Sequence, residues 1–139
     1  MAECIFCRIV EGKIPCARIY EDDEALAFLD IGPLAPGHIL LIPKRHFERI
    51  WEVPSELLVT LVRKLPRLSR ALLEATGAQG LNILQNNGPV SGQAVSHLHL
   101  HLIPRTAGDG LGYRWNAGRY GPGEIESVQK RILGAMGED

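Results

Sequence analysis

A run of alternating histidine and apolar residues constrains the fold of this chain more than any other feature. Residues 96–103 read SHLHLHLI. Side chains of a β-strand point alternately to opposite faces of a sheet. The alternation therefore predicts a strand with His97, His99 and His101 on one face and leucines on the other, where the leucines can pack against a helix. We expect Pro104 to end this strand.

Four further strands are predicted along the chain, over residues 17–20, 25–31, 38–43 and 81–85. The third of them is a continuous apolar run, which suits a central strand that is covered on both faces. A final helix is expected over residues 124–136. Because few connections are long enough for a parallel crossover, the pattern favours an α+β fold with a five-stranded, mostly antiparallel sheet.

A leucine-rich segment predicts one long helix over residues 55–75 or so. The leucines recur at spacings of one, three and four, which places them in one stripe that packs in the core. Ser55 can cap the start of this helix and Gly77 its end. Pro66 lies inside it. Because proline lacks a backbone N–H and crowds the preceding turn, we expect a kink there.

The length of 139 residues fits one domain, with a core over residues 4–105 and a tail over residues 106–139. Lys and Arg total 15 and Asp and Glu total 16, and the resulting net charge of −1 argues against broad, charge-driven binding to nucleic acid or to anionic membranes. No apolar run approaches the roughly 18 residues of a membrane span. The start of the sequence shows no secretory signal. We therefore expect a cytoplasmic protein.

Three histidines on one strand face need an explanation, because they displace apolar side chains from the core. They can be structural and held by hydrogen bonds, they can bind a catalytic metal ion, or they can be catalytic themselves. The chemistry favours the third interpretation. Imidazole has a reference pKa of about 6.5, so its neutral form is available as a nucleophile near neutral pH.

The three cysteines are Cys4, Cys7 and Cys16. An odd number of cysteines in a chain that is expected to be cytoplasmic disfavours a disulfide framework. Cys4 and Cys7 form a C-x-x-C pair, which can bind a metal, carry out redox chemistry or have no function. The βαβ context of a thioredoxin-like redox pair is missing. Cys16 is interpreted as a packed or surface thiol.

The segment GQAVSHLHLHLI at residues 92–103 resembles the signature of the histidine triad (HIT) family, in which apolar residues separate three histidines. The segment CIFCRIV at 4–10 is similar to the start of that family, and AFLDI at 27–31 and PGHILLIPKRH at 36–46 are similar to its central strands. The resemblance covers residues 4–105 and is nearest to the Hint-like and bacterial branch. It implies a HIT-like fold and a homodimer in which two five-stranded sheets join into one of ten strands.

The resemblance also implies a nucleotide hydrolase or transferase that acts at the α-phosphorus. His99 would form a nucleotidyl-histidine intermediate, with its second ring nitrogen held by a backbone carbonyl within the triad. The implied substrates are purine nucleoside phosphoramidates, and the bound nucleotide is of the AMP or GMP type. The alternatives are a hydrolase or phosphorylase of dinucleoside polyphosphates, and a zinc-stabilised nucleotide-binding protein with little turnover.

Site residues follow from the same resemblance, position by position. The catalytic set is His99, His101, His38 and Gln93. The nucleotide-binding set is Asp30, Ile31, Phe28, Asn86, Gly92, Ala94 and Val95. Asp30 would accept hydrogen bonds from the ribose hydroxyls but also suits a turn, and Phe28 and Ile31 suit a core equally well. Ala94 replaces a serine or threonine of some relatives, and the lost hydrogen bond to phosphate would weaken transition-state binding by roughly 1–3 kcal/mol.

Zinc is the cofactor that the resemblance implies. Its ligands would be Cys4, Cys7, His46 and His97, which stand at positions that bind structural zinc in many bacterial HIT proteins. Two thiolates and two imidazoles form a closed tetrahedral shell, so the metal would be structural. It would tie the N-terminal segment to the strand that carries His99.

The tail mixes aromatic, glycine and arginine residues. Arg114, Trp115 and Arg119 either shape the preference for a leaving group or belong to a surface loop. The sequence leaves both interpretations open.

Overall fold

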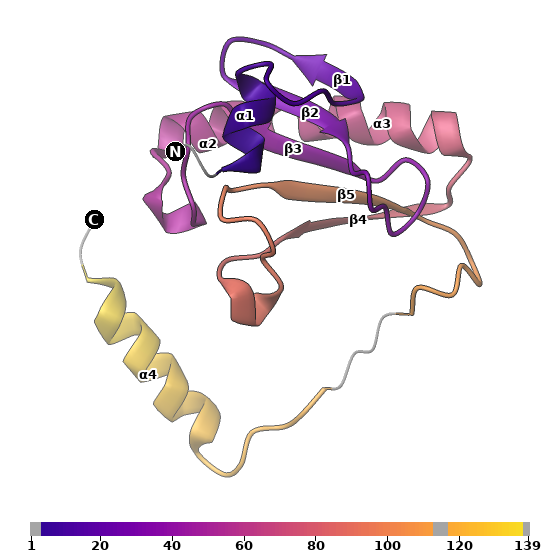
Figure 1. The fold of residues 1–139 in the computed structure, drawn as a ribbon. Coiled ribbons are helices and arrows are strands. Elements are labelled where there is room, and N and C mark those ends of the chain that lie inside the picture. Colours follow the sequence, from indigo (N-terminus) through magenta and orange to yellow (C-terminus); the bar gives the residue numbers. More distant parts are fainter. Residues whose placement is uncertain (1–3, 113–116, 138–139) are drawn as a thin grey trace.

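The computed structural model describes residues 4–112 and 117–137. Its sheet has five strands in the order β1-β2-β3-β5-β4, and every neighbouring pair is antiparallel (Figure 1). The strands are β1 (Arg18–Glu21), β2 (Ala25–Leu29), β3 (Ile39–Pro43), β4 (Gly80–Gln85) and β5 (Leu100–Arg105). The predicted α+β fold with a five-stranded antiparallel sheet is therefore confirmed.

Helices pack on both faces of this sheet, with α1 (Ile5–Val10) on one face and α2 (Ser55–Val62) and α3 (Leu65–Thr76) on the other. A fourth helix, α4 (Glu124–Met136), lies apart from the sheet, and the chain also forms the short 3-10 turns η1 (Ile50–Glu52) and η2 (Pro89–Ser91) (Figure 1). The final helix has the bounds that the sequence predicts. None of the helices in the described part of the chain is both long and apolar enough to cross a membrane. The cytoplasmic location stays a prediction.

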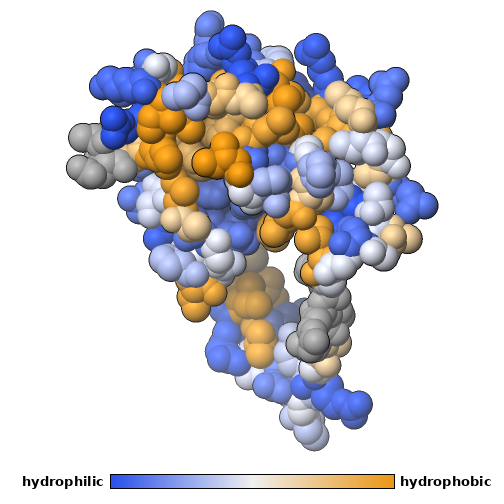
Figure 2. All heavy atoms as spheres, turned by 45° about the vertical axis from the view of Figure 1, so that its right-hand side comes forward, coloured by the Kyte–Doolittle hydropathy of each residue, from blue (hydrophilic) through white to orange (hydrophobic). Residues whose placement is uncertain are grey.

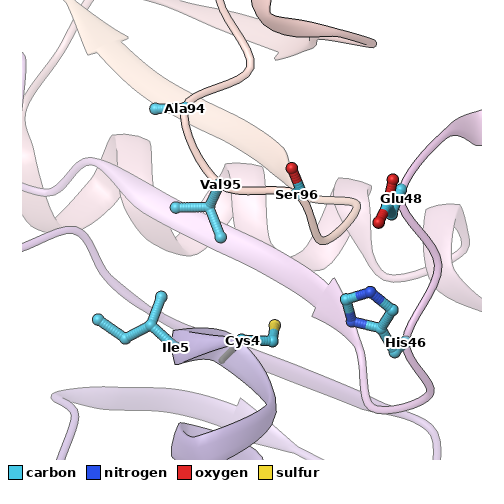
Figure 3. A pocket seen from close by; sticks show the side chains of 7 residues that line it. All are labelled: Cys4, Ile5, His46, Glu48, Ala94, Val95 and Ser96. Carbon is cyan, nitrogen blue, oxygen red and sulfur yellow. The ribbon is translucent and has the colours of Figure 1, made fainter. Parts of the chain in front are cut away.

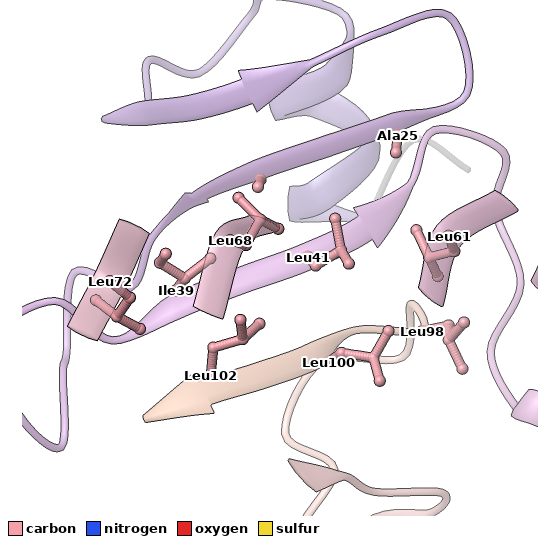
Figure 4. Packing of buried hydrophobic residues seen from close by; sticks show 10 residues of the cluster. Ala25, Ile39, Leu41, Leu61, Leu68, Leu72, Leu98, Leu100 and Leu102 are labelled. Carbon is pink, nitrogen blue, oxygen red and sulfur yellow. The ribbon is translucent and has the colours of Figure 1, made fainter. Parts of the chain in front are cut away.

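The strand β3 lies at the centre of the fold, and all five of its residues are buried. Leu41 faces the cluster formed with α2 and α3, which Figure 4 shows from close by. Leu40 faces the opposite way, toward Phe6 of α1. This double covering is the reason for the continuous apolar run of β3, as predicted.

The single long helix predicted over residues 55–75 is wrong, because the segment forms two helices. The helix α2 ends at Val62 and α3 begins at Leu65, so the chain breaks before Pro66 instead of bending at it. The ring of Pro66 would crowd the carbonyl of Val62, four residues earlier, and no N–H is there to bond it. In the first turn of α3 the missing N–H costs nothing. Gly77 ends α3 with a left-handed φ of 70°, as expected.

The predicted bounds of the fifth strand also need correction. It begins at Leu100, four residues after Ser96, and it continues through Pro104. Its pairing with β3 ends at Leu102, so one side of the strand has no neighbour at Pro104 and the proline is tolerated. Before the strand, the N–H of Leu98 bonds the carbonyl of Phe47 instead of a sheet partner.

Candidate active site and metal centre

The three histidines keep the alternation that the sequence predicts, although two of them precede the strand. Leu98 packs in the cluster under α2 and α3. On the opposite face, the ring of Phe6 meets the rings of His97 and His99 edge-on, at centroid distances of 5.8 and 5.2 Å. The helix α1 therefore covers the histidine face, a contact that the sequence pattern did not predict.

A backbone carbonyl holds the ring of His99 in one tautomer. Its Nδ1 lies 2.7 Å from the carbonyl oxygen of His97, and because that oxygen can only accept, Nδ1 carries the proton. The lone pair is therefore on Nε2. This is the arrangement expected for a nucleophilic imidazole, with the acceptor inside the triad.

A second pair of imidazoles, His38 and His101, lies beside His99. The N–H of Leu34 donates to His38 Nδ1 at 3.1 Å, which leaves the ring proton of neutral His38 on Nε2. That nitrogen lies 2.9 Å from His101 Nδ1 and donates to it, so the proton of His101 is on Nε2. Burial lowers the pKa of both rings, that of His101 to about 4 with a further effect of nearby His99. Both are neutral hydrogen-bond donors at pH 7.

Four metal-binding side chains meet where the N-terminal segment reaches the sheet. The Nδ1 of His97 lies 3.3 Å from Cys4 Sγ, 3.6 Å from Cys7 Sγ and 3.2 Å from His46 Nδ1. The Nδ1 of His46 lies 3.4 Å from Cys7 Sγ. Ligand atoms around a tetrahedral zinc ion are about 3.3–3.8 Å apart, given Zn–N and Zn–S bonds of about 2.0 and 2.3 Å. The four donors thus fit zinc in kind and in spacing.

The protonation states in this cluster also suit a metal. The Nε2 of buried His97 donates to the carbonyl oxygen of Pro43 at 2.9 Å, which leaves the lone pair on Nδ1, facing the cluster. Burial lowers the pKa of His97 to about 4, so this ring is neutral at pH 7. Burial and the neighbouring Cys4 raise the pKa of the Cys7 thiol to about 11. A bound cation would displace that proton.

Asp30, His38 and His101 form a second group of close donor atoms, all within 4.8 Å of one another. A metal there would need a lone pair on His38 Nε2. The N–H of Leu34 already occupies the lone pair on Nδ1, so the ring would have to lose its last proton. The hydrogen bond from His38 Nε2 to His101 Nδ1 therefore fits these atoms better than a bound metal ion does.

An apolar cavity of about 300 Å³ opens beside His99 and His101. The other predicted site residues that line it are Phe28, Asp30, Ile31, Ala94 and Val95, and α1 adds Ile5, Phe6 and Ile9. This volume lies in the range of small-molecule sites, and the mixture of apolar walls with a few polar groups is typical of them. The half-buried Cys16 is also part of the wall.

A neighbouring cavity of about 360 Å³ shares Ile5, Ala94 and Val95 with the first. Figure 3 shows that it lies between the start of α1 and the loop before β5, with Cys4 and His46 on one side and Glu48 and Ser96 on another. The metal centre and the apolar cavity therefore have adjoining walls.

Three further predicted residues, Asn86, Gly92 and Gln93, lie in the loop after β4. Gln93 is buried, and its side-chain oxygen accepts from Gly88 N and from Arg49, while its nitrogen donates to the carbonyl of Glu48. These bonds brace the loop, and a direct contact of Gln93 with substrate stays a prediction. Gly92 has a φ of 105° and faces the side chain of Asn86 so closely that a Cβ would lie 3.3 Å from its amide nitrogen.

Sequence reasoning missed several groups that complete the site. Phe6 lies on a six-residue helix whose start is capped by Cys4 Sγ, which accepts from Cys7 N. Leu34 N and the carbonyl of Pro43 act through the backbone, so no side-chain pattern could have indicated them. Arg114 and Trp115 lie outside the described residues, and Arg119 is exposed.

The fold and these histidines define a histidine triad protein, an α+β domain with three alternating histidines where strand β5 begins. The family model described as HIT domain matches residues 11–108. The chain belongs to the HIT family. It is 38% identical over 130 residues to an adenosine 5'-monophosphoramidase of Schizosaccharomyces pombe, covering 93% of this chain and 95% of the relative.

Solved structures of family members share the whole fold. A crystal structure of a HIT protein from Bacillus subtilis aligns with a TM-score of 0.92 at 38% identity and covers 99% of both chains. A zinc-bound histidine triad protein from Mycobacterium smegmatis aligns with a TM-score of 0.75, also at 38% identity, over 96% of this chain and 98% of that one.

Proposed function

We propose that the protein hydrolyses purine nucleoside phosphoramidates through a nucleotidyl-histidine intermediate on His99. The observation that carries the proposal is the fixed tautomer of His99, whose Nε2 lone pair borders a cavity of nucleotide size. The name of the Schizosaccharomyces pombe relative supports an adenosine phosphoramidate as substrate. The adjoining donor, His101 Nε2–H, would bind a phosphate oxygen and stabilise the charge that develops there.

The reaction proceeds in two displacements. The Nε2 of His99 attacks the α-phosphorus, a new N–P bond forms, and the bond to the leaving amine breaks while the amine takes up a proton from the solvent. The imidazole is then a cation, which the carbonyl of His97 stabilises through Nδ1–H. A water molecule next attacks phosphorus, and the bond to His99 breaks. This step releases the nucleoside monophosphate and neutral His99, and the attacking water gives one proton back to the solvent.

The apolar cavity would hold the purine base. Phe28, Ile31 and the α1 side chains supply apolar walls, and Asp30 lies at the cavity where it could accept from ribose hydroxyls. Asn86 and Gly92 would face the phosphate. The purine preference and these individual contacts are part of the proposal.

The first test is turnover of an adenosine monophosphate amide that carries a fluorogenic amine. The wild type should release the amine and show a transient adenylyl adduct by intact mass. His99→Ala should lose both but still bind AMP. Absence of turnover and adduct in the wild type would rule out the phosphoramidase proposal. Turnover of dinucleoside polyphosphates would then favour the second hydrolase type, and its absence a binding role.

We also infer that zinc occupies the cluster of Cys4, Cys7, His46 and His97 as a structural ion. A closed set of four protein ligands leaves no position for substrate, so the metal would organise the site without entering the reaction. The zinc-bound relative from Mycobacterium smegmatis supports this choice of metal.

The exposed edge of the sheet supports the predicted homodimer. The edge strand β4 has the sequence GLNILQ, which contains no charged residue, and Ile83 and Leu84 remain exposed on it. Natural sheets protect free edges with charges, prolines or covering segments, and none of these is present within β4. Pairing of two copies along β4 would produce the ten-stranded sheet.

A further inference from the structure

The segment after His46 is bonded to the loop at residues 86–93, which we call the β4 loop because it follows that strand. The carbonyl oxygen of Glu48 accepts from the side-chain nitrogen of Gln93 at 2.8 Å. The guanidinium of Arg49 donates to the oxygen of the same amide at 3.0 Å. The carboxylate of Glu48 lies 3.7 Å from Arg49, but it is 45% exposed and so competes only weakly with that amide.

The two ends of the Gln93 amide cannot exchange places. Arg49 and the N–H of Gly88 can only donate, so the atom that lies 3.0 and 2.6 Å from them is the oxygen. The backbone carbonyl of Glu48 can only accept, so the atom that faces it is the nitrogen. Because two donors already occupy the oxygen, it has no lone pair left to offer a substrate.

The β4 loop is also bonded internally and at a second point of the same segment. The backbone N–H groups of Ser91 and Gln93 both donate to the carbonyl of Gly88, at 3.1 Å each. The side chain of Asn87 accepts from the N–H of Ile50 at 2.8 Å. A displacement of Gln93 would therefore displace the loop around it.

The residues directly after Gln93 form cavity walls, whereas Gln93 itself does not. Ala94 and Val95 line both the apolar cavity beside His99 and the neighbouring cavity. Gln93 lines neither of the two, and only 5% of its surface is exposed. The amide of Gln93 thus sets the position of the wall without facing either cavity.

All members of this network belong to the body of one copy. Figure 2 shows the segment that carries α4 protruding below that body, and none of the hydrogen bonds named above involves α4. The network is therefore independent of the homodimer proposed above.

We propose that Arg49 and Gln93 are positioning residues. Arg49 fixes the amide of Gln93, and Gln93 fixes the β4 loop, so that the loop and Ala94 are held where the phosphate of the nucleotide would bind. Neither side chain touches the substrate in this role. The inference rests on the proposed function, and it replaces the catalytic role that the resemblance implies for Gln93.

A double-mutant cycle tests whether Arg49 acts through Gln93. In the adenosine monophosphate amide assay, Arg49→Met should lower kcat/KM about tenfold and Gln93→Leu about 100-fold, because misplacement by about 1 Å has a cost of this order. The double variant should match Gln93→Leu within about twofold. Losses that multiply would overturn the proposal, because Arg49 would then act independently of Gln93.

Two further variants separate positioning from net charge and from folding. Arg49→Lys keeps a donor for the Gln93 oxygen and should recover part of the loss seen in Arg49→Met. Arg70→Met removes the same charge from an exposed site on α3 and should leave kcat/KM unchanged. Equal losses in Arg49→Lys and Arg49→Met, with both variants folded by thermal unfolding, would overturn the role of Arg49 as a donor.

A series of leaving amines distinguishes positioning from direct contact. If Gln93 acts only on the loop, Gln93→Leu should lower kcat/KM by the same factor for aromatic and aliphatic amides of adenosine monophosphate. A loss confined to one class of amine would overturn the proposal, because Gln93 would then contact the leaving group.

Calorimetric binding of AMP and of adenosine separates this inference from the proposed function. Arg49→Met and Gln93→Leu should each weaken AMP binding about tenfold, as expected for a lost hydrogen bond to a charged group, and leave adenosine binding unchanged. This pattern in a protein without amide turnover would retain the positioning role and reject the phosphoramidase proposal. Wild-type affinity for AMP in both variants would overturn the positioning role, even in an active enzyme.

Discussion

The Nδ1 of His99 donates to the backbone carbonyl of His97 at 2.7 Å. His97 thus takes part in two sites at once, because its carbonyl orients the proposed nucleophile while its ring belongs to the Cys and His cluster. The proposed metal centre and the proposed nucleophile are therefore linked through one residue.

Loss of the metal should impair both stability and catalysis. Cys7→Ser should remove bound zinc and lower the melting temperature by about 10 °C, which corresponds to roughly 3 kcal/mol in a chain of this size. Because α1 also lines the apolar cavity beside His99, kcat/KM should fall about 10- to 100-fold. Metal analysis, thermal unfolding and the amide assay measure the three effects.

Cys16→Ser is the matched control for this prediction. Cys16 is a free thiol outside the four-residue cluster, so its replacement should leave the zinc content unchanged. If Cys7→Ser retains stoichiometric zinc, the assigned ligand set is incorrect.

The hydrogen-bonded pair of His38 and His101 should determine the rate of nucleotidyl transfer to His99. His38→Ala removes the donor to His101 Nδ1, so the proton of His101 would no longer be held on Nε2. We expect kcat to fall about 100-fold with little change in the affinity for AMP. His38→Gln can place an amide N–H near the position of Nε2 and should recover part of the loss. Equal rates for the two variants would exclude this positioning role.

Stability should decrease as the pH falls. Burial lowers the folded-state pKa of His38 and His101, the latter to about 4, whereas histidines of the unfolded chain titrate near a pKa of about 6.5. The contribution of these rings to the free energy of unfolding is therefore fully present above about pH 6.5. It is lost progressively as the pH falls to about 4. Denaturant unfolding from pH 4.5 to 7.5 should show this slope.

The variant His101→Gln separates this effect from metal release at low pH. It keeps the Cys and His cluster intact but removes one titrating ring, so the pH dependence of its unfolding free energy should be flatter than that of the wild type. Identical slopes would show that metal release alone causes the acid sensitivity.

A hydroxyl at position 94 should improve catalysis. Ala94 lines both cavities and has no hydrogen-bonding group to offer phosphate. Ala94→Thr should raise kcat/KM for the adenosine monophosphate amide about tenfold, consistent with one hydrogen bond to a charged group. Ala94→Val introduces a side chain with the shape of threonine but without its hydroxyl, so it should not raise kcat/KM. A similar gain in both variants would indicate an effect of shape.

Local patterns predicted most of the fold. The period of two around His99 placed the histidines and leucines on opposite faces even where the backbone leaves the sheet, because alternation depends on extended backbone and not on ladder bonds. The helix break at Pro66 and the extension of β5 through Pro104 escaped prediction. The effect of each proline depends on where neighbouring backbone groups lie, and sequence spacing alone does not give this.

The candidate site was likewise predictable only in part. Its residue types were visible in the sequence, and resemblance to the HIT family assembled Cys4, Cys7, His46 and His97 into one set. The tautomers of His97, His99 and His38 depend on Pro43, His97 and Leu34, all of which act through backbone atoms. A backbone N–H or carbonyl is present at nearly every residue, so sequence cannot indicate which one meets a given ring.

The sequence on its own was sufficient for the α+β class, the central position of β3 and the alternation of the triad, because these follow from residue type and from periods of two to four residues. Folding over long separations determined the rest. It joined His97 to Cys4 across 93 positions, covered the histidines with Phe6, and left Ile125, Ile132 and Met136 of α4 exposed. Such contacts arise from the packing of whole elements, which no local pattern encodes.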